Sequence, residues 1–111
     1  MKKTLIFSEN QMEWQKHPQF PGVFVKPVLK GDEGYGFRTS FIKVVPGGEI
    51  LPHTHDVTEV FYFYKGKALV LANGENIEVS AGDLIIAPAG EEHGTKNLSD
   101  EDVYLLANFE A

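Results

Sequence analysis

The stretch "PGGEILPHTHDVTEVFYFYKG", residues 46–66, carries a strand pattern and three side chains that are capable of binding a metal. Its second half, "TEVFYFYK", is rich in β-branched and aromatic residues and ends at Gly66, which is typical of a β-strand. Its first half places His53 and His55 two residues apart, with Glu59 four residues later. In an extended segment residues i and i+2 project from one face, so both imidazoles can converge on one ion. The stretch predicts either a metal site or a hairpin that contains histidines by chance.

Short apolar runs bounded by Gly, Pro, Asn and Asp recur along most of the chain. They are "GVFVKPVL", "YGFRTSFIKVV", "TEVFYFYK", "KALVLA", "NIEV", "DLIIAP" and "DVYLLANF". No stretch shows a convincing i, i+3, i+4, i+7 apolar stripe, so the pattern indicates an all-β sandwich or barrel. The clearest local feature is Asn73-Gly74 between two apolar runs, which predicts a tight hairpin within "KALVLANGENIEVSAG", residues 67–82.

The length of the chain predicts one globular domain. A chain of 111 residues is long enough for one core and too short for two. We expect residues 1–20, anchored by Trp14 and Phe20, to form an arm or an edge strand, and residues 21–111 to form a single domain.

The composition restricts partners and location. A net charge of −6 argues against nucleic-acid binding, which needs a basic face. The absence of cysteine excludes thiolate metal sites and suits a cytoplasmic protein. The apolar stretch in the opening "MKKTLIF" is shorter than the central region of a signal peptide. No run of apolar residues is long enough to predict a membrane span.

The runs "VFYFY" and "DLIIA" are continuous rather than alternating. Such runs indicate that the outer face of at least one sheet is covered as well as the inner face. A small domain has few elements of its own for this purpose, so we expect a homodimer. An N-terminal segment folded over the sheet is the alternative.

Glycines frame the histidines in two motifs. The first reads G-x5-H-x-H-x3-E-x6-G from Gly47 to Gly66, and the second reads G-x5-P-x-G-x2-H-x3-N from Gly82 through His93 to Asn97. In both motifs the chain resembles the cupin superfamily, and in the short segment between them it is similar to the compact single-domain microbial cupins.

The resemblance implies an antiparallel jelly-roll β-barrel, also called a double-stranded β-helix, that is commonly dimeric. It also implies one divalent metal ion held by His53, His55, Glu59 and His93. Three imidazoles and one carboxylate suit iron, manganese, nickel, cobalt or zinc, and they leave two positions open on a six-coordinate ion.

For several other residues both a structural and a functional interpretation have to be considered. Phe61 shares strand parity with Glu59 and can belong to both the core and the pocket lining. Arg38, the only arginine, is either a pocket residue that binds a carboxylate or a solvated surface residue. Asn97 is expected to satisfy backbone groups, and His17 to lie at the surface.

The glutamates next to His93 are not expected to form a catalytic pair. Glu91 and Glu92 lie in a polar loop, whereas a paired-carboxylate mechanism would need one of them buried with a raised pKa.

Two functional classes remain open. The chain is either a metalloenzyme, dioxygenase-like or a Lewis-acid isomerase, or a module that binds or senses a sugar, a carboxylate or another small molecule without turning it over. The open coordination positions argue against a purely structural ion. No catalytic acid or base is assigned by the sequence.

Overall fold

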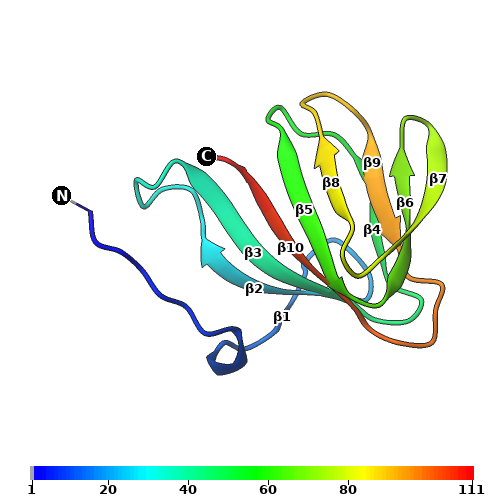
Figure 1. Cartoon of the computed structure of the whole chain (residues 1–111), viewed down its shortest axis with the longest axis horizontal. Coiled ribbons are helices and arrows are strands. Elements are labelled where there is room, and N and C mark those ends of the chain that lie inside the picture. The colour runs from blue at the N-terminus through cyan, green and yellow to red at the C-terminus, as the bar shows by residue number, and fades with distance from the viewer. Residues whose placement is uncertain (1) are drawn as a thin grey trace.

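The computed structural model describes residues 2–111, which form two antiparallel β-sheets and one short 3-10 helix (Figure 1). The elements are η1 (Glu9–Gln11), β1 (Gln15–Lys16), β2 (Val23–Leu29), β3 (Phe37–Val44), β4 (Glu49–His53), β5 (Glu59–Lys65), β6 (Lys67–Ala72), β7 (Glu75–Ser80), β8 (Leu84–Ala87), β9 (His93–Lys96) and β10 (Val103–Glu110). The predicted all-β class is confirmed. No helix within the described residues is long and apolar enough to cross a membrane.

The two sheets enclose one hydrophobic core. The larger sheet has the strand order β1-β2-β3-β10-β5-β8, and the smaller has the order β4-β9-β6-β7. Buried side chains from both sheets pack together between them: Val23, Val44, Phe61, Phe63, Ala68, Val70, Val79, Ala87, Val103, Leu105 and Ala107. The sequence runs "EILPH" and "HGTK", which form β4 and β9, are not among the seven strand-like runs of the sequence.

Side chains of β5 alternate between the two faces of the larger sheet. Glu59, Phe61 and Phe63 are all buried on the inner face, as their shared parity predicts. Tyr62 faces outward and is 42% exposed. The continuous apolar run of β5 therefore supplies both a core face and an apolar outer face.

The predicted hairpin is confirmed between β6 and β7. Ala72 pairs with Glu75, so the loop contains two residues, Asn73 and Gly74. Their φ angles are 53° and 76°, and two consecutive positive φ angles are the requirement of a type I′ turn.

The N-terminal segment covers part of the outer face of the larger sheet. β1 pairs with β2 at the sheet edge. The Trp14 ring packs against Tyr104 at 5.9 Å between centroids. Glu9 accepts a hydrogen bond from the Tyr64 hydroxyl at 3.0 Å, and its carboxylate lies 3.5 Å from the ammonium of the buried Lys26.

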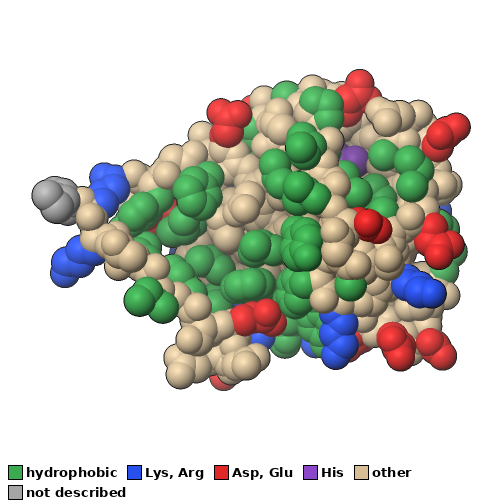
Figure 2. All heavy atoms as spheres, in the orientation of Figure 1, with side chains coloured by type: hydrophobic (Ala, Val, Ile, Leu, Met, Phe, Trp, Pro, Cys, Tyr) green, Lys and Arg blue, Asp and Glu red, His purple; other side chains and the backbone are tan. Residues whose placement is uncertain are grey.

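Another part of this face stays uncovered. Tyr62 on β5 pairs with Leu84 on β8, and Leu84 and Ile86 are 56% and 64% exposed. Figure 2 shows hydrophobic side chains gathered over the middle of the molecule in this view. The residues Tyr62, Leu84 and Ile86 are referred to below as the apolar strip.

Candidate metal centre

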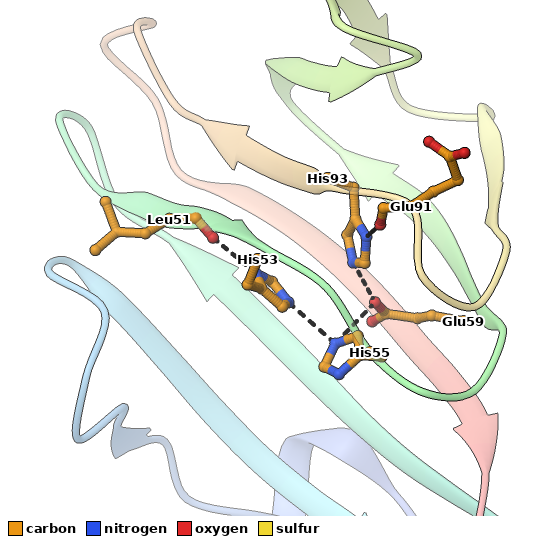
Figure 3. A network of polar contacts seen from close by, with 6 residues as sticks. All are labelled: Leu51, His53, His55, Glu59, Glu91 and His93. Atoms are coloured by element: carbon orange, nitrogen blue, oxygen red, sulfur yellow. Dashed lines mark hydrogen bonds and ion pairs between the residues drawn. The ribbon is translucent and has the colours of Figure 1, made fainter.

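Four side chains converge at one end of the space between the sheets (Figure 3). His53 ends β4, His55 lies in the following turn, Glu59 begins β5 and His93 begins β9. His53 and His93 face each other as a cross-strand pair. One nitrogen or oxygen atom from each of the four residues lies within 4.8 Å of the others. This cluster of three histidines and one glutamate could hold a metal ion, and its members are those named by the two sequence motifs.

Backbone carbonyls fix the tautomers of two of these histidines. Nδ1 of His53 lies 2.6 Å from the Leu51 carbonyl oxygen, and Nδ1 of His93 lies 3.2 Å from that of Glu91. A carbonyl only accepts, so each Nδ1 carries the proton and donates it. In neutral imidazoles this leaves a lone pair on both Nε2 atoms, which is how metal-binding histidines are oriented in proteins.

The distances within the cluster fit a shared cation. Nε2 of His53 and Nε2 of His55 are 3.0 Å apart, and Oε1 of Glu59 lies 3.6 Å from His55 Nε2 and 2.8 Å from His93 Nε2. Ligands about 2.1 Å from one ion and at right angles to each other lie about 3.0 Å apart. Converging lone pairs and a carboxylate repel one another unless a positive charge lies among them, so the donor set fits a divalent ion.

Without a metal, protons compete for the same positions. The pKa of His93 is raised above its ordinary 6.5, first because its ring hydrogen-bonds to the Glu59 carboxylate, while burial opposes this shift. The pKa of His55 is lowered, first by burial and then by the charges around it, although Glu59 acts in the opposite direction. The neutral form required for metal binding is thus favoured at His55 and disfavoured at His93.

The cluster opens into a cavity of about 130 Å³ between the sheets. The cavity is lined by His17, Phe20, Val23, Ile42, Ile50, His53, His55, Glu59, Phe61, His93, Thr95, Leu105 and Phe109. Beyond the four clustered residues, only His17 and Thr95 contribute polar side-chain atoms. A ligand that reached the cluster would meet mostly hydrocarbon on its other sides.

Close backbone packing positions the two strands that carry His53 and His93. A Cβ atom on Gly94 would lie 2.9 Å from the carbonyl oxygen of Ile50 and 3.1 Å from the nitrogen of Pro52. Gly94 therefore allows β9 to approach β4 closely. The turn before β9 is tied to the same region, because the amide of Gly90 donates to the carbonyl of His55 at 2.8 Å.

Of the two residues predicted to line the pocket, one lines the cavity and the other does not. Phe61 lines the cavity, and its ring stacks on His93 at 5.9 Å between centroids. Arg38 lies on β3, directly across from Phe109, and its guanidinium covers the Phe109 ring at 3.9 Å. The half-buried Arg38 is not among the cavity-lining residues, and its buried Nε atom has no hydrogen-bond partner.

Two structural interpretations are confirmed. The fully buried Asn97 donates to the carbonyls of Val44 and Glu101 and accepts from the amide and hydroxyl of Ser99. The side chains of Glu91 and Glu92 are exposed, which does not fit a buried catalytic pair.

His17 was expected at the surface rather than among the ligands; it lies outside the four-donor cluster, but it is only partly exposed. Its side chain is half-buried, stacks on Phe20 at 4.4 Å between ring centroids, and lines the cavity. Burial, followed by the charge of His53, lowers its pKa. Phe109 was also missed as a lining residue, although it shares strand parity with Leu105 and Ala107. His17 has no fixed spacing from either motif, so no sequence pattern could place it here.

The sequence of the chain is similar to that of a known protein. It is 30% identical over 67 residues to an oxalate-binding protein of Thermotoga maritima, which is 60% of this chain and 55% of that protein. The chain thus spans little more than half the length of that curated relative.

Several solved structures have a similar fold over nearly the whole length of this chain. A predicted oxalate decarboxylase from Thermotoga maritima has a TM-score of 0.86 and 20% sequence identity, with 96% of this chain and 98% of that chain covered. KdgF from a Halomonas species has a TM-score of 0.81 and 24% identity, with 96% and 94% covered. The polyketide cyclase RemF from Streptomyces resistomycificus has a TM-score of 0.83 and 21% identity, with 99% and 80% covered. At these identities the likeness shows the fold.

A family model, described as a cupin domain, matches residues 40–109. The match spans more than half of the 111-residue chain and includes both glycine-framed motifs with all four clustered residues. The family match, the two-sheet fold and the cluster of three histidines and one glutamate therefore agree, and this chain belongs to the cupin family.

Proposed function

We propose that this cupin binds one divalent transition metal through His53, His55, Glu59 and His93, and that it is a metalloenzyme for a small organic ligand. The observation that supports this most directly is the convergence of four donor atoms, two of them with tautomers fixed by backbone carbonyls. Iron, manganese, nickel, cobalt and zinc all suit this donor set.

A divalent ion at this position would supply a Lewis acid with open positions for a chelating ligand. The residues of the chain would hold the ion and surround the ligand. Three imidazoles and one carboxylate hold the ion, and Phe61 and its apolar neighbours exclude water around the ligand. Exclusion of water strengthens each polar contact that the ligand makes inside the cavity.

The size of the cavity restricts the ligand. A cavity of about 150 Å³ is known to admit benzene, so the 130 Å³ available here suits a ligand of similar size. One relative is named an oxalate-binding protein, which supports a small carboxylate as the ligand class. The reaction would be of a dioxygenase-like type or an isomerisation.

The second candidate is a binding or sensing protein without turnover. It is favoured by the lack of an assignable general base near the cluster, because Glu91 and Glu92 are exposed. It predicts saturable ligand binding with the ligand recovered unchanged.

Metal content is the first test. Untagged protein and its His93→Ala variant would be assayed for bound metals by mass spectrometry, before and after reconstitution with each divalent ion. We expect close to one ion per chain in the parent protein and loss of that ion in the variant. If the parent protein holds no ion after reconstitution, the proposal fails.

Turnover is the second test. Metal-loaded protein would be incubated with oxalate and with small 2-oxo acids while oxygen consumption and products are recorded. Metal-dependent product formation supports the enzyme. Saturable binding without product supports the binding protein.

We further propose a homodimer in which a second copy covers the apolar strip. Ile6 is 90% exposed, and Leu5 and Phe7 are 44% and 47% exposed, in a segment that extends away from the sheets (Figure 1). The chain's own fold thus leaves both this segment and the strip uncovered. Two copies related by a two-fold axis would each present the same surfaces and could bury them reciprocally.

A further inference from the structure

His17 occupies a position that the cupin motifs do not account for. It lies in the connection between β1 and β2, outside the matched residues 40–109. Its ring stacks on Phe20 at an interplanar angle of 16°, and the Phe20 ring lies 5.5 Å from that of His53. One aromatic ring therefore separates His17 from the cluster, and His17 lines the same cavity without belonging to the four-donor group.

The surrounding backbone fixes which nitrogen of His17 carries the proton. The amides of Gln19 and Phe20 both donate to Nδ1, each at 3.1 Å. The His17 amide donates to the Val23 carbonyl at 2.8 Å, which anchors the turn to β2. Because Nδ1 accepts from two donors, a proton on it would face two N–H groups. The neutral ring therefore carries its proton on Nε2 and can only donate there.

This Nε2–H donor has no acceptor within the described residues. The hydrogen bonds of the His17 ring all involve Nδ1. Among the described residues, the one unpartnered polar side-chain atom sealed in the interior is Nε of Arg38, so Nε2 of His17 is accessible to solvent, and His17 is one of the residues that line the cavity. The nearby lining is hydrocarbon, including Phe20 and Val23. The acceptor is then either water or an oxygen atom of a ligand that enters the cavity.

We propose that His17 binds a carboxylate or carbonyl oxygen of the ligand as a neutral Nε2–H donor. This assignment rests on the proposed function, in which a small carboxylate occupies the cavity at the metal. It makes His17 a ligand-binding residue that polarises or orients an oxygen, and it excludes His17 as a general base through Nε2. Specificity would then come partly from the N-terminal segment that precedes the matched region.

Three substitutions separate the donor from the stacking role. His17→Gln keeps an N–H donor and loses the aromatic ring, His17→Phe keeps the ring and loses the donor, and His17→Ala loses both. Gln19→Ala on the same turn is the matched control, because Gln19 donates to His17 through its backbone amide, which the substitution keeps. Affinity for oxalate, malonate and pyruvate would be measured by calorimetry on zinc-loaded proteins of verified zinc content.

We expect all four variants to retain zinc. Loss of one hydrogen bond to a charged oxygen should weaken binding by about tenfold or more in His17→Ala and His17→Phe, with partial recovery in His17→Gln. The Gln19→Ala protein should match the parent. The proposal is overturned if His17→Phe binds as tightly as the parent, or if the zinc-loaded parent binds none of the three probes.

A measurement on the ring itself tests the assigned donor separately. Nitrogen-15 NMR of the imidazoles in metal-free protein should show His17 protonated at Nε2 and unprotonated at Nδ1. The opposite tautomer would overturn the assignment. Because this spectrum requires no metal, it distinguishes failure of the His17 assignment from failure of the metal-binding proposal.

Discussion

Glu59 controls the charge of the histidine next to it. Its carboxylate raises the pKa of His93, whereas burial alone would lower it. Replacing Glu59 with Gln removes the negative charge and leaves the burial. We therefore expect the pKa of His93 to fall in metal-free Glu59→Gln, as measured by an NMR titration of the ring, although the hydrogen bond to the Glu91 carbonyl still favours the charged form.

The same pair predicts a pH-dependent stability. A histidine with a raised folded-state pKa contributes its full stabilisation below the unfolded pKa of 6.5 and loses it as pH rises through the folded value. Urea unfolding of metal-free protein should show a larger destabilisation by Glu59→Gln at about pH 6 than at about pH 9. Glu92→Gln, which alters an exposed neighbouring acid, should show no such pH dependence.

Asn97 illustrates a motif residue whose role is structural. Its amide group satisfies two backbone carbonyls and accepts two hydrogen bonds from Ser99 in a site with no solvent exposure. Asn97→Ala removes all of these hydrogen bonds from a buried site and should lower the free energy of unfolding by about 2–4 kcal/mol. Asn76→Ala, at an exposed position on β7, should change it by less than about 0.5 kcal/mol. A similar loss in both variants would contradict this role.

At the scale of elements, the contact between β4 and β9 determines whether the cluster forms. Gly94→Ala would place a methyl group 2.9 Å from the Ile50 carbonyl oxygen, so one strand must move. That movement separates His53 from His93. We expect metal affinity to fall by about tenfold or more, as measured by competition with a chelating dye.

Another position on β9 offers a control for this substitution. Lys96→Ala, two residues further along the strand, should leave metal affinity unchanged. Unchanged metal affinity in Gly94→Ala would show that the spacing of β4 and β9 is not critical to the cluster.

The two strands that carry His53 and His93 were the hardest to predict. β5, β6 and β10 have runs of apolar or β-branched residues, and the sequence locates them nearly to the residue. β4 contains a proline, and β9 reads "HGTK", yet most of β9 is buried. Their side chains are selected for the site rather than for a hydrophobic pattern, so periodicity could not reveal them.

At the scale of the whole molecule, the exposed apolar strip predicts association. The double variant Leu84→Lys with Ile86→Lys should shift a dimer toward monomer, because charges would enter an interface built from apolar side chains. Light scattering coupled to size-exclusion chromatography measures this directly. Ile77→Lys changes a residue that is 43% exposed on the smaller sheet and should not alter the mass. A monomeric parent protein would contradict the prediction.

The sequence by itself determined the all-β class, the Asn73-Gly74 hairpin and the four candidate ligands. The class and the hairpin follow from local rules, since strand periodicity and turn conformation are properties of neighbouring residues, whereas the four ligands are what the resemblance of the two motifs to cupins implies. Only the tertiary structure decided that His17 lines the cavity and that Arg38 lies behind Phe109. Those positions depend on strand pairing and on the docking of a segment remote in the chain, and no local pattern encodes either.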